Sequence, residues 1–534
     1  MNRQNIHKTL YFVLLLLLAA SLPLSIYTTS LVQILLLINW MAEGNFREKW
    51  ERIRSEKALW VFALFYGVHL AGMIWSTDWV YGLKDLKIKL SIFVLPVIIV
   101  SSGIPARTRL RYILLVFIGA NIIASLASVM ALLNWLPVEI DDFRDASLFI
   151  SHIRFSLMIV MSIAFAAYLL VAHRHINSGA VTGLLIAALA WLPVFLIILR
   201  SLSGIIILLV LTVVIAFVLV RKMKAPVIRL SLTLLILLIP VGTLLYLGYA
   251  VNRFYSVEEI SREEIDRETT EGNPYLNIPH RKEIENGNYV WLHISRKELK
   301  REWNRRSDIP WDGQTEEGTG IQMTLIRYLT SKGLRKDAQG MGQLDSTDIR
   351  AIEEGIANHL YREKFKLYPR IYELIWEIDR FRLGYSPNEK SMVQRLFYLR
   401  AGWTIARENP WKGVGTGDVG QAFASYYENN DSPLKPSRRR RAHNQYLTLM
   451  LTFGVFGAVI CIASLVTPIS MKNRGSSFMV LVLILTMALS MLNEDTLETT
   501  AGAVPFAFFY ALFIFGPDWP WRRLNEDREE GVKT

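Results

Sequence analysis

The residues best suited to do chemistry stand together in residues 438–447, which read RRRRAHNQYL. This stretch ends a long polar segment and runs directly into an apolar run that begins at Leu447. Histidine is the side chain whose ordinary pKa lies closest to neutral pH, so we predict that His443 transfers a proton. Asn444 and Tyr446 could orient its ring or anchor the following helix at the level of the lipid headgroups. The alternative is an interfacial histidine that is satisfied by hydrogen bonds and has no catalytic role.

Several arginines stand near the expected outward ends of apolar runs and could bind an anion. Their forked guanidinium donors match phosphate oxygens, and such groups are costly near a membrane unless they are paired. A set of arginines with one histidine therefore fits a lipid-linked phosphate or diphosphate. Glu494, a candidate supporting residue, provides with Asp495 and Glu498 the alternative of a structural ion-pair network. The candidate anion-binding residues are Arg154, Arg200, Arg395, Arg400 and Arg441.

A glycine-rich turn, GVGTGDVG over residues 413–420, precedes the arginine run. Its spacing matches the dinucleotide-binding pattern, but no strand precedes it and no βαβ unit surrounds it, so the match is weak. As a tight turn, its backbone amides could approach a phosphate, which gives supporting roles to Gly413, Gly415, Gly417 and Asp418. The sequence contains no P-loop, no zinc-protease motif and no serine-hydrolase elbow. The one cysteine, Cys461, leaves no cysteine-based metal site.

The elements that must position these residues are membrane helices. With 52% hydrophobic residues in 534 and a positive mean hydropathy, the chain is too apolar for a soluble multidomain protein. The apolar residues form uninterrupted runs, which predicts an all-α polytopic membrane protein with about twelve transmembrane helices. The predicted spans cover residues 9–25, 28–42, 58–75, 90–103, 110–134, 150–172, 179–199, 202–220, 227–250, 445–468, 476–492 and 501–516.

The net charge of +12 does not indicate a nucleic-acid partner, because much of it lies in short loops between apolar runs. Basic loops recur on one side, and the alternate loops, such as residues 139–142 and 493–495, are acidic or neutral. Both termini are therefore predicted to be cytoplasmic, and the loop with Lys84, Lys87 and Lys89 is the one exception. The basic positions on the predicted cytoplasmic side are Arg3, Lys8, residues 47–57, Arg107, Arg109, Arg111, Arg174, Arg221, Lys222, Lys224, Lys472, Arg474, Arg522 and Arg523.

This orientation divides the chain into three predicted parts. Residues 1–250 form an N-terminal bundle of about nine spans, and residues 445–534 form about three spans with a cytoplasmic tail. Residues 251–444 form a large, mostly helical external loop, in which 346–385 suits two or three amphipathic helices. Four arginines on the translocated side oppose the usual charge preference, so a bound anion or an acidic partner explains them better than orientation does. A solvated surface is the alternative.

Five segments together resemble the O-antigen ligase and O-antigen polymerase superfamily. Residues 409–418 read NPWKGVGTGD, residues 443–447 read HNQYL, and residues 454–457 read GVFG, in the order of the family signature. Residues 493–498, NEDTLE, and residues 325–333, LIRYLTSKG, are similar to members of a Bacteroidetes-like branch. The resemblance covers the span pattern, the large external loop and the C-terminal third.

The resemblance implies a membrane glycosyltransferase of the GT-C type at the periplasmic face of the bacterial inner membrane. Its donor would be a glycan linked to undecaprenyl diphosphate. The acceptor would be lipid A-core in the ligase branch, or another lipid-linked glycan in the polymerase branch. Ligase members act without a metal or other cofactor, their essential histidine maps onto His443, and the arginine ahead of the glycine motif maps onto Arg395.

One position departs from the family pattern. Where members often have Ser-Arg, a small residue and Gly, this chain has Ser201, Leu202, Ser203 and Gly204, and the arginine is displaced to Arg200. Two residues along a helix correspond to about 200° of rotation. Arg200 can therefore replace the family arginine only if the helix begins after it.

The sequence leads to the hypothesis of an O-antigen ligase with inverting chemistry. His443 would be the general base on the acceptor hydroxyl, and the arginines would hold the diphosphate leaving group. A polymerase of the same superfamily is the alternative within the enzyme class. A twelve-span transporter is a rival from another class, but the sequence shows no repeated halves. A periplasmic scaffold without catalysis is the third alternative.

Overall fold

The computed structural model describes residues 3–138, 147–172, 177–257, 265–363, 367–388 and 391–519. The acidic loop at 139–142 and the basic positions 174, 522 and 523, which entered the predicted orientation, lie outside these residues. The chain forms two compact units. The first unit combines Met1–Val218 with Arg395–Thr534, and the second unit is Leu219–Gln394.

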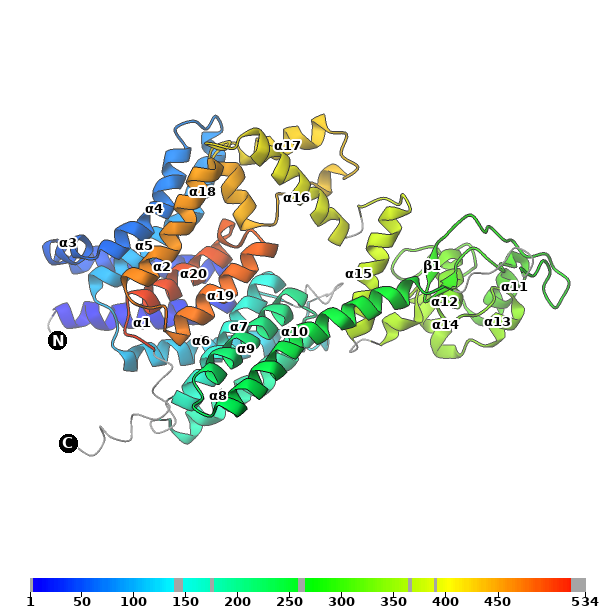
Figure 1. Ribbon diagram of the computed structural model, residues 1–534, viewed down its shortest axis with the longest axis horizontal. Helices are drawn as coiled ribbons and strands as arrows, with labels where there is room; N and C mark the ends of the chain where they lie inside the picture. The colour runs from blue at the N-terminus through cyan, green and yellow to red at the C-terminus, as the bar shows by residue number, and fades with distance from the viewer. Residues whose placement is uncertain are drawn as a thin grey trace. The chain divides into compact units, whose positions relative to one another are not determined.

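The first unit is a bundle of helices (Figure 1). Its N-terminal helices are α1 Arg3–Leu24, α2 Ile26–Glu43, α3 Phe46–Ser55, α4 Lys57–Gly72, α5 Trp79–Ser102, α6 Arg107–Leu132, α7 His152–Ala172, α8 Gly179–Ile198 and α9 Leu202–Arg221. Its C-terminal elements are α16 Ser391–Glu408, α17 Val419–Asn429, the 3-10 helix η4 Pro436–Arg438, α18 Gln445–Met471, α19 Phe478–Asn493, the 3-10 helix η5 Thr496–Glu498 and α20 Thr500–Ile514.

The second unit begins with a long helix and continues as a small mixed lobe. Its elements are α10 Pro226–Tyr255, β1 Ile284–Glu285, β2 Asn288–Tyr289, α11 Arg296–Arg306, α12 Ile321–Ser331, α13 Ala338–Gly342, α14 Ser346–Glu353, the 3-10 helix η3 His359–Arg362 and α15 Leu367–Arg382. The two strands pair antiparallel, with Ile284 opposite Tyr289. Helices α14 and α15 are the amphipathic helices expected within 346–385.

The boundaries of the units differ from the divisions expected at residues 250 and 444. Residues 395–444 join the first unit because α16 and α17 share an apolar core with α18, to which Tyr398, Phe423 and Leu451 contribute. Helix α10 joins the second unit because Phe254 near its end packs on the ring of Tyr372 in α15. Contacts between side chains, not the hydropathy of each segment, decide both assignments.

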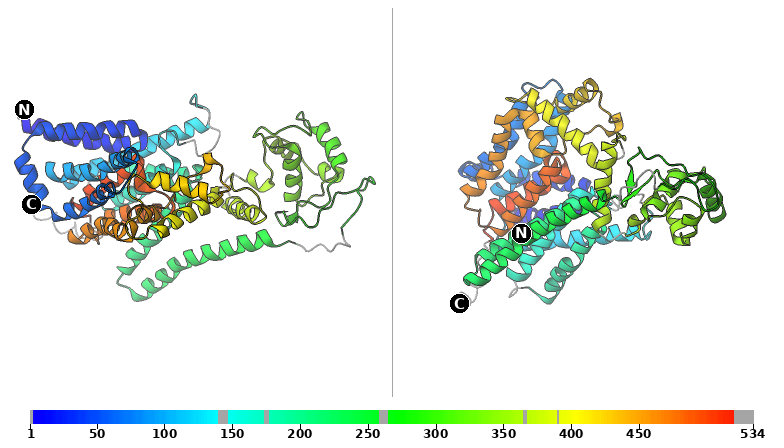
Figure 2. Two further views of the ribbon diagram at one scale, coloured as in Figure 1. Left: turned by 90° about the horizontal axis from the view of Figure 1, so that it is seen from above. Right: turned by 45° about the vertical axis from the view of Figure 1, so that its right-hand side comes forward.

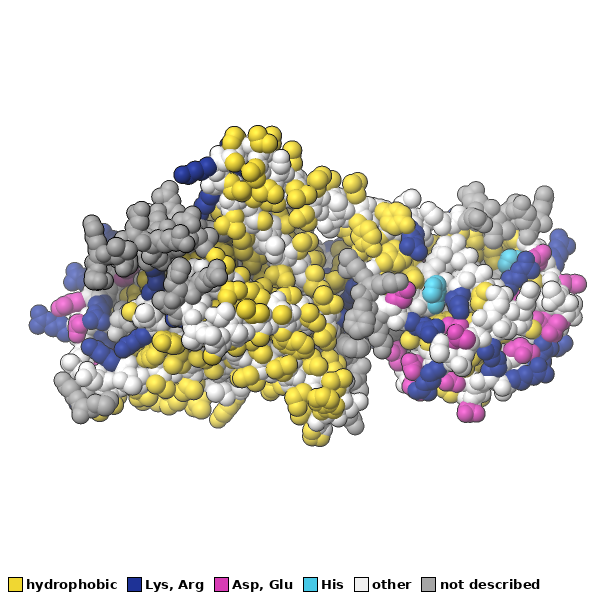
Figure 3. Space-filling model, turned by 90° about the horizontal axis from the view of Figure 1, so that it is seen from below, with side chains coloured by type: hydrophobic (Ala, Val, Ile, Leu, Met, Phe, Trp, Pro, Cys, Tyr) yellow, Lys and Arg dark blue, Asp and Glu magenta, His cyan; other side chains and the backbone are white. Residues whose placement is uncertain are grey.

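The structure is mostly helical, as expected of a polytopic all-α membrane protein. Among the described helices, α1, α2, α6, α7, α8, α9, α10 and α18 are long and apolar enough to cross a membrane, and α4, α19 and α20 are shorter apolar helices. Each of the twelve predicted spans overlaps one helix, since the span expected at 90–103 falls in α5. Large apolar side chains remain exposed along the bundle, and Figure 3 shows them gathered over much of its visible face.

The expected loop with Lys84, Lys87 and Lys89 is wrong, because all three residues lie inside α5. The helix begins earlier than its apolar run because the Asp78 side chain accepts a hydrogen bond from the amide of Tyr81 and caps it. Lys89 is buried there and contacts two carboxylates, those of Asp85 and Glu498. Neutralised in this way, a lysine fits an otherwise apolar helix.

The core of the first unit lies around α20, which is buried from Gly502 to Ile514. The ring of Tyr510 stacks on Phe62 of α4 with 4.2 Å between centroids, and Phe509 meets Phe117 of α6 edge-on. Helices α4 and α18 lie side by side, as Figures 1 and 2 show. These contacts fix the N-terminal end of α18, where the predicted site stands.

The lobe of the second unit has its own core, built around the buried rings of Trp303 and Tyr328. The turn between the strands is Asn286-Gly287, and both residues have positive φ, as tight hairpins require. The buried carboxylate of Glu285 beside this turn accepts hydrogen bonds from Arg327 and Asn358, at 2.7 Å each. The paired Glu285 therefore serves the structure of the lobe.

Candidate active site

Three cationic or proton-binding side chains converge on one carboxylate, that of Glu494. His443 Nδ1 lies 3.4 Å from Oε2, a guanidinium nitrogen of Arg395 lies 3.2 Å from Oε1, and Arg154 Nη1 lies 3.7 Å from Oε2. Glu494 and Arg154 are buried, whereas about a third of the His443 and Arg395 side chains is exposed (33% and 30%). The group therefore stands at the edge of the bundle, with its histidine and one arginine open to solvent or substrate.

Each of these side chains comes from a different element. Arg154 lies in the first turn of α7, Arg395 lies near the start of α16, and His443 precedes α18. Glu494 follows the last residue of α19, Asn493, whose side-chain oxygen accepts a hydrogen bond from Arg395. Sequence reasoning assigned no role to Asn493, because its partner lies 98 residues away.

The N-terminus of α18 holds His443 in its place. The Asn444 side chain caps the helix by accepting from the backbone amide of Leu447 at 2.9 Å, and the backbone amide of Asn444 donates to the Asp495 carboxylate at 3.1 Å. His443 itself has a φ of 50°, which is uncommon for a residue other than glycine. Its ring lies 5.4 Å from that of Tyr398. The ring is therefore set between α16 and the loop that carries Glu494.

Tyr446, the second predicted supporting residue beside His443, contacts another helix instead. Its hydroxyl donates to the carbonyl of Ala488 in α19 at 3.0 Å. It thereby joins α18 to α19, whose end leads into Glu494. The structure thus favours the anchoring role for Tyr446 over direct orientation of the imidazole.

The charges around Glu494 act on its proton affinity. Burial works to raise the pKa of Glu494, but the hydrogen bond from His443 and the charge of Arg154 outweigh burial and hold that pKa below its ordinary value. The carboxylate is therefore ionised at neutral pH and can act only as a hydrogen-bond acceptor. It follows that Nδ1 of His443 carries the proton in this contact.

A second cluster of charges lies on the far side of the same loop, around Glu498. Its Oε2 accepts from Lys89 at 2.7 Å and from Arg441 at 3.0 Å, and its Oε1 accepts from Gln445 at 2.9 Å. Burial works to raise the pKa of Glu498, but Lys89 and Arg441 outweigh it and hold the pKa well below its ordinary value. Arg441 also donates to the hydroxyl of Tyr81.

A small pocket opens beside this second cluster. Charged side chains from α5 and η5 and hydroxyl groups from α18 line it, together with Arg441. Sequence reasoning missed Lys89, Asp85 and Gln445, which are part of the cluster or its pocket. The available signal was a lysine four residues after an aspartate, just before an apolar run.

The backbone amides of the glycine-rich turn are hydrogen-bonded within the protein, so the turn is not an open anion-binding loop. Gly454 has a φ of 67° and breaks α18, so the amide of Val455 donates to Pro410 instead of the preceding helical turn. The carbonyls of Leu451 and Thr452, which this break frees, accept from the amides of Val414 and Gly415 at 2.9 Å each. These amides are thus committed to α18.

The turn also fastens the junction between α4 and α5. The amide of Gly417 donates to Ser76 at 2.9 Å, and the Asp418 carboxylate accepts from the amides of Thr77 and Asp78. A side chain at Gly413 would meet the backbone of Thr452 at 2.2 Å. The predicted supporting residues 413, 415, 417 and 418 therefore position α4, α5 and α18.

The other predicted arginines differ in their positions. Arg200 has a φ of 50° in the turn before α9, and α9 begins at Leu202, so the condition for replacing the family arginine is met. This turn lies near the site, because Ser203 accepts a hydrogen bond from Asn493 at 2.8 Å. Arg400 is exposed on α16 and makes no hydrogen bond or ion pair with another described side chain.

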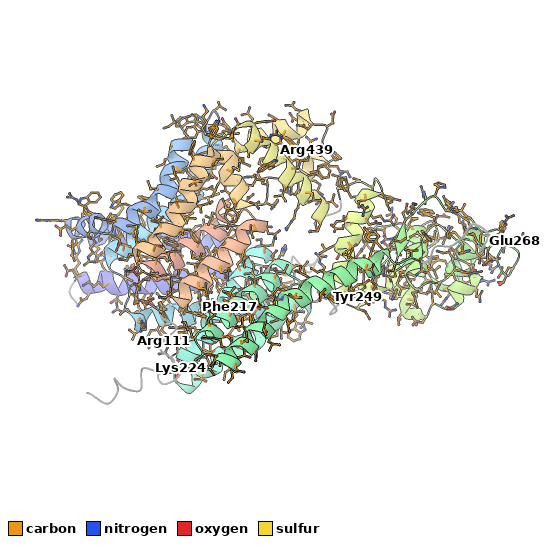
Figure 4. All side chains as sticks on the ribbon, in the orientation of Figure 1. Arg111, Phe217, Lys224, Tyr249, Glu268 and Arg439 are labelled. Carbon is orange, nitrogen blue, oxygen red and sulfur yellow. The ribbon has the colours of Figure 1, made fainter. Side chains whose placement is uncertain are left out.

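The arginine run before α18 is fixed mainly through its backbone. The carbonyl of Arg438 accepts from the hydroxyl of Tyr398 at 2.6 Å, and that of Arg440 accepts from Tyr427 at 2.7 Å. Arg439 lies before α18 (Figure 4). Its guanidinium lies 5.9 Å from the centre of the Tyr427 ring. Of the four arginines, Arg441 is the one that pairs with a buried carboxylate, Glu498.

The comparison with protein families matches residues 355–462 to the family model described as O-antigen ligase. The matched segment contains Arg395, the glycine-rich turn, His443 and the break at Gly454. A comparison with curated proteins gives no match. The predicted resemblance is confirmed: this chain carries, over residues 355–462, a domain of the O-antigen ligase and polymerase superfamily.

Proposed function

We propose that this protein is an O-antigen ligase that transfers a glycan from undecaprenyl diphosphate to a hydroxyl group of lipid A-core. The observation that carries the proposal is the convergence of His443, Arg395 and Arg154 on Glu494. His443 and Arg395 lie inside the matched family segment. A proton acceptor and two guanidinium groups within one cluster suit the transfer of a sugar away from a diphosphate.

The arginines bind the leaving group. Arg395 is partly exposed and its guanidinium can donate to a second anion besides Glu494, while Arg154 has a buried Nη1 without a hydrogen-bond partner among the described residues. Arg200 adds a charge from the neighbouring turn, and Arg441 and Arg400 extend the basic surface. Fixed cations stabilise the negative charge that develops on the diphosphate as the glycosidic bond breaks.

His443 removes the proton from the acceptor. Because Nδ1 carries a proton toward Glu494, the lone pair of the neutral ring lies on Nε2, which accepts the hydrogen of the acceptor hydroxyl. The oxygen then bonds to the anomeric carbon, the bond from that carbon to the diphosphate oxygen breaks, and the configuration inverts. The proton remains on His443 until solvent takes it, and the lipid diphosphate leaves with the electron pair.

The proposal places the site at the periplasmic face of the bacterial inner membrane. About twelve helices then cross the membrane, both termini are cytoplasmic, and the large loop lies between the ninth and tenth spans. The basic residues of α3, which precedes α4, and those in the first turns of α6 support this orientation. Undecaprenyl-diphosphate glycan, lipid A-core and membrane lipids are the partners of this arrangement.

The test is a transfer assay with purified full-length protein, lipid-linked glycan and lipid A-core. We expect His443→Ala to lower kcat by about 100-fold or more, the usual contribution of a positioned base. His280→Ala, an exposed histidine in the second unit, is the matched control and should keep the wild-type rate. Activity should also survive a chelator.

Three results would contradict the proposal: full activity of His443→Ala, loss of activity on chelation, or no glycan transfer to lipid A-core. If glycan chains grow on the lipid carrier while lipid A-core stays unmodified, the protein is a polymerase of the same superfamily.

A further inference from the structure

Glu494 is shared between the proposed base and two arginines that the proposed function assigns to the diphosphate. One of its oxygens faces Arg395 at 3.2 Å, and the other faces both His443 and Arg154, at 3.4 and 3.7 Å. With a neutral imidazole, the two guanidinium charges exceed the one carboxylate charge by a single positive unit.

A bound diphosphate changes this balance. Its oxygens compete with Glu494 for the donors of Arg395 and Arg154, because a guanidinium binds carboxylate and phosphate with the same forked geometry. Once the arginines are neutralised by the donor, the carboxylate charge acts on His443 alone. Glu494 then stabilises the imidazolium that forms when the acceptor proton moves to the ring.

We propose that Glu494 is a positioning residue that couples donor binding to activation of His443. It holds His443 in the tautomer with the lone pair on Nε2. It also pairs with Arg395 and Arg154 until a diphosphate takes its place as their partner. This inference rests on the proposed function. It adds an order of events: the base gains full strength only after the lipid-linked donor is bound.

The groups around His443 support a fixed rather than a mobile carboxylate. Arg395 and Tyr398 face the ring from α16, and Arg154 reaches the cluster from α7. Glu494 lies in the loop before η5. That loop is bound to α18, because Asp495 accepts a 2.7 Å hydrogen bond from Thr448. The φ of 50° at His443 adds backbone strain that persists where the surroundings determine it, as at functional sites.

The experiment compares Glu494→Gln with wild type in full-length protein reconstituted in lipid nanodiscs. Glutamine keeps the size of the side chain and removes the charge. We expect kcat to fall by about 100-fold or more, and the acidic limb of the kcat–pH profile to move to lower pH, because the group that stabilises the imidazolium is lost. Glu428→Gln, exposed on α17, is the matched control.

Binding of undecaprenyl diphosphate without a glycan provides the second measurement. Glu494→Gln should bind this probe several-fold more tightly than wild type, because the competing carboxylate has been removed. Damage to the fold would instead weaken binding and catalysis together. In the His443→Ala background, Glu494→Gln should cost little additional kcat, since the two residues act as one unit.

The coupling is wrong if Glu494→Gln leaves kcat unchanged, if it weakens binding of undecaprenyl diphosphate, or if its effect on kcat adds fully to that of His443→Ala. If the glutamine variant does not fold, Glu494→Asp tests the coupling instead, because aspartate keeps the charge but has a side chain one methylene shorter. A kcat between those of wild type and His443→Ala, with the acidic limb unmoved, supports the coupling, and a wild-type kcat overturns it. Full activity of His443→Ala would instead refute the base in the proposed function.

Discussion

At the scale of single residues, the site is a set of compensated charges in apolar surroundings. Glu494 and Glu498 stand four positions apart, and each contacts two or more basic side chains. Burying any one of these charges alone would be costly, so each cation is placed where a carboxylate already stands. The diphosphate of the proposed function would enter such a cluster by exchange, without creating an unpaired charge.

Arg395 gives a direct test of anion binding at this scale. Arg395→Gln removes the guanidinium that contacts Asn493 and Glu494, so the KM for the lipid-linked donor should rise about tenfold or more and kcat should fall by about 100-fold. Arg407→Gln, exposed near the end of the same helix, removes an equal charge as the control. Equal behaviour of the two variants in steady-state kinetics would contradict a diphosphate role for Arg395.

At the scale of elements, the break in α18 determines where the site stands. The glycine-rich turn fills the gap that Gly454 leaves in the helical hydrogen bonds, and Asp418 fastens the same turn to the amides after α4. The N-terminal turns of α18, which follow His443, are thereby tied to α4 and α5. The turn uses its amides for these contacts, so it contributes by positioning.

The contact between the glycine-rich turn and the break at Gly454 leads to a prediction about stability. A Cβ there would lie 2.1 Å from the carbonyl oxygen of Trp411, and the φ of 67° disfavours any L side chain. Gly454→Ala should therefore lower the stability by more than about 2 kcal/mol and abolish transfer. Gly119→Ala in α6, where a Cβ would have no atom within 4 Å, is the control. Thermal unfolding of both detergent-purified variants distinguishes them. Equal unfolding midpoints would contradict the structural role of the contact at Gly454.

At the scale of the whole molecule, orientation in the membrane decides which substrates can reach the site. In the proposed function, the lipid A-core acceptor is available only on the side of the membrane on which the loop domain is proposed to lie. The proposed orientation places Arg296, which begins α11, outside and Lys224, which lies between α9 and α10 (Figure 4), inside. The distribution of basic residues supports this orientation.

Cysteine labelling tests the orientation without disturbing the site. The natural cysteine, Cys461, is buried, so the wild-type chain should give little background. In intact spheroplasts a membrane-impermeant maleimide should label Arg296→Cys, and it should label Lys224→Cys only after the membrane is permeabilised. Labelling in the reverse order would place the site in the cytoplasm and contradict the periplasmic ligase.

Sequence patterns alone predicted the apolar helices and the residues that could do chemistry. Uninterrupted apolar runs are a local property, so the predicted spans each overlap a helix, and the order of short motifs identified the superfamily. His443, Arg395 and Glu494 were named from residue type and from that resemblance alone.

How these residues meet depends on the packing of distant helices. His443 and Glu494 are 51 positions apart, Arg154 and Asp495 are 341 apart, and Lys89 and Glu498 are 409 apart. No spacing rule links positions at such separations. The tertiary fold brought Arg154 to Glu494, left Arg400 on the surface and turned Lys89 from an expected loop residue into a buried ion-pair partner. It also bound the amides of the glycine-rich turn to α18 and to the junction of α4 and α5. The physical reason is that a charge within an apolar bundle is stable only beside its partner, and packing of distant helices chooses that partner.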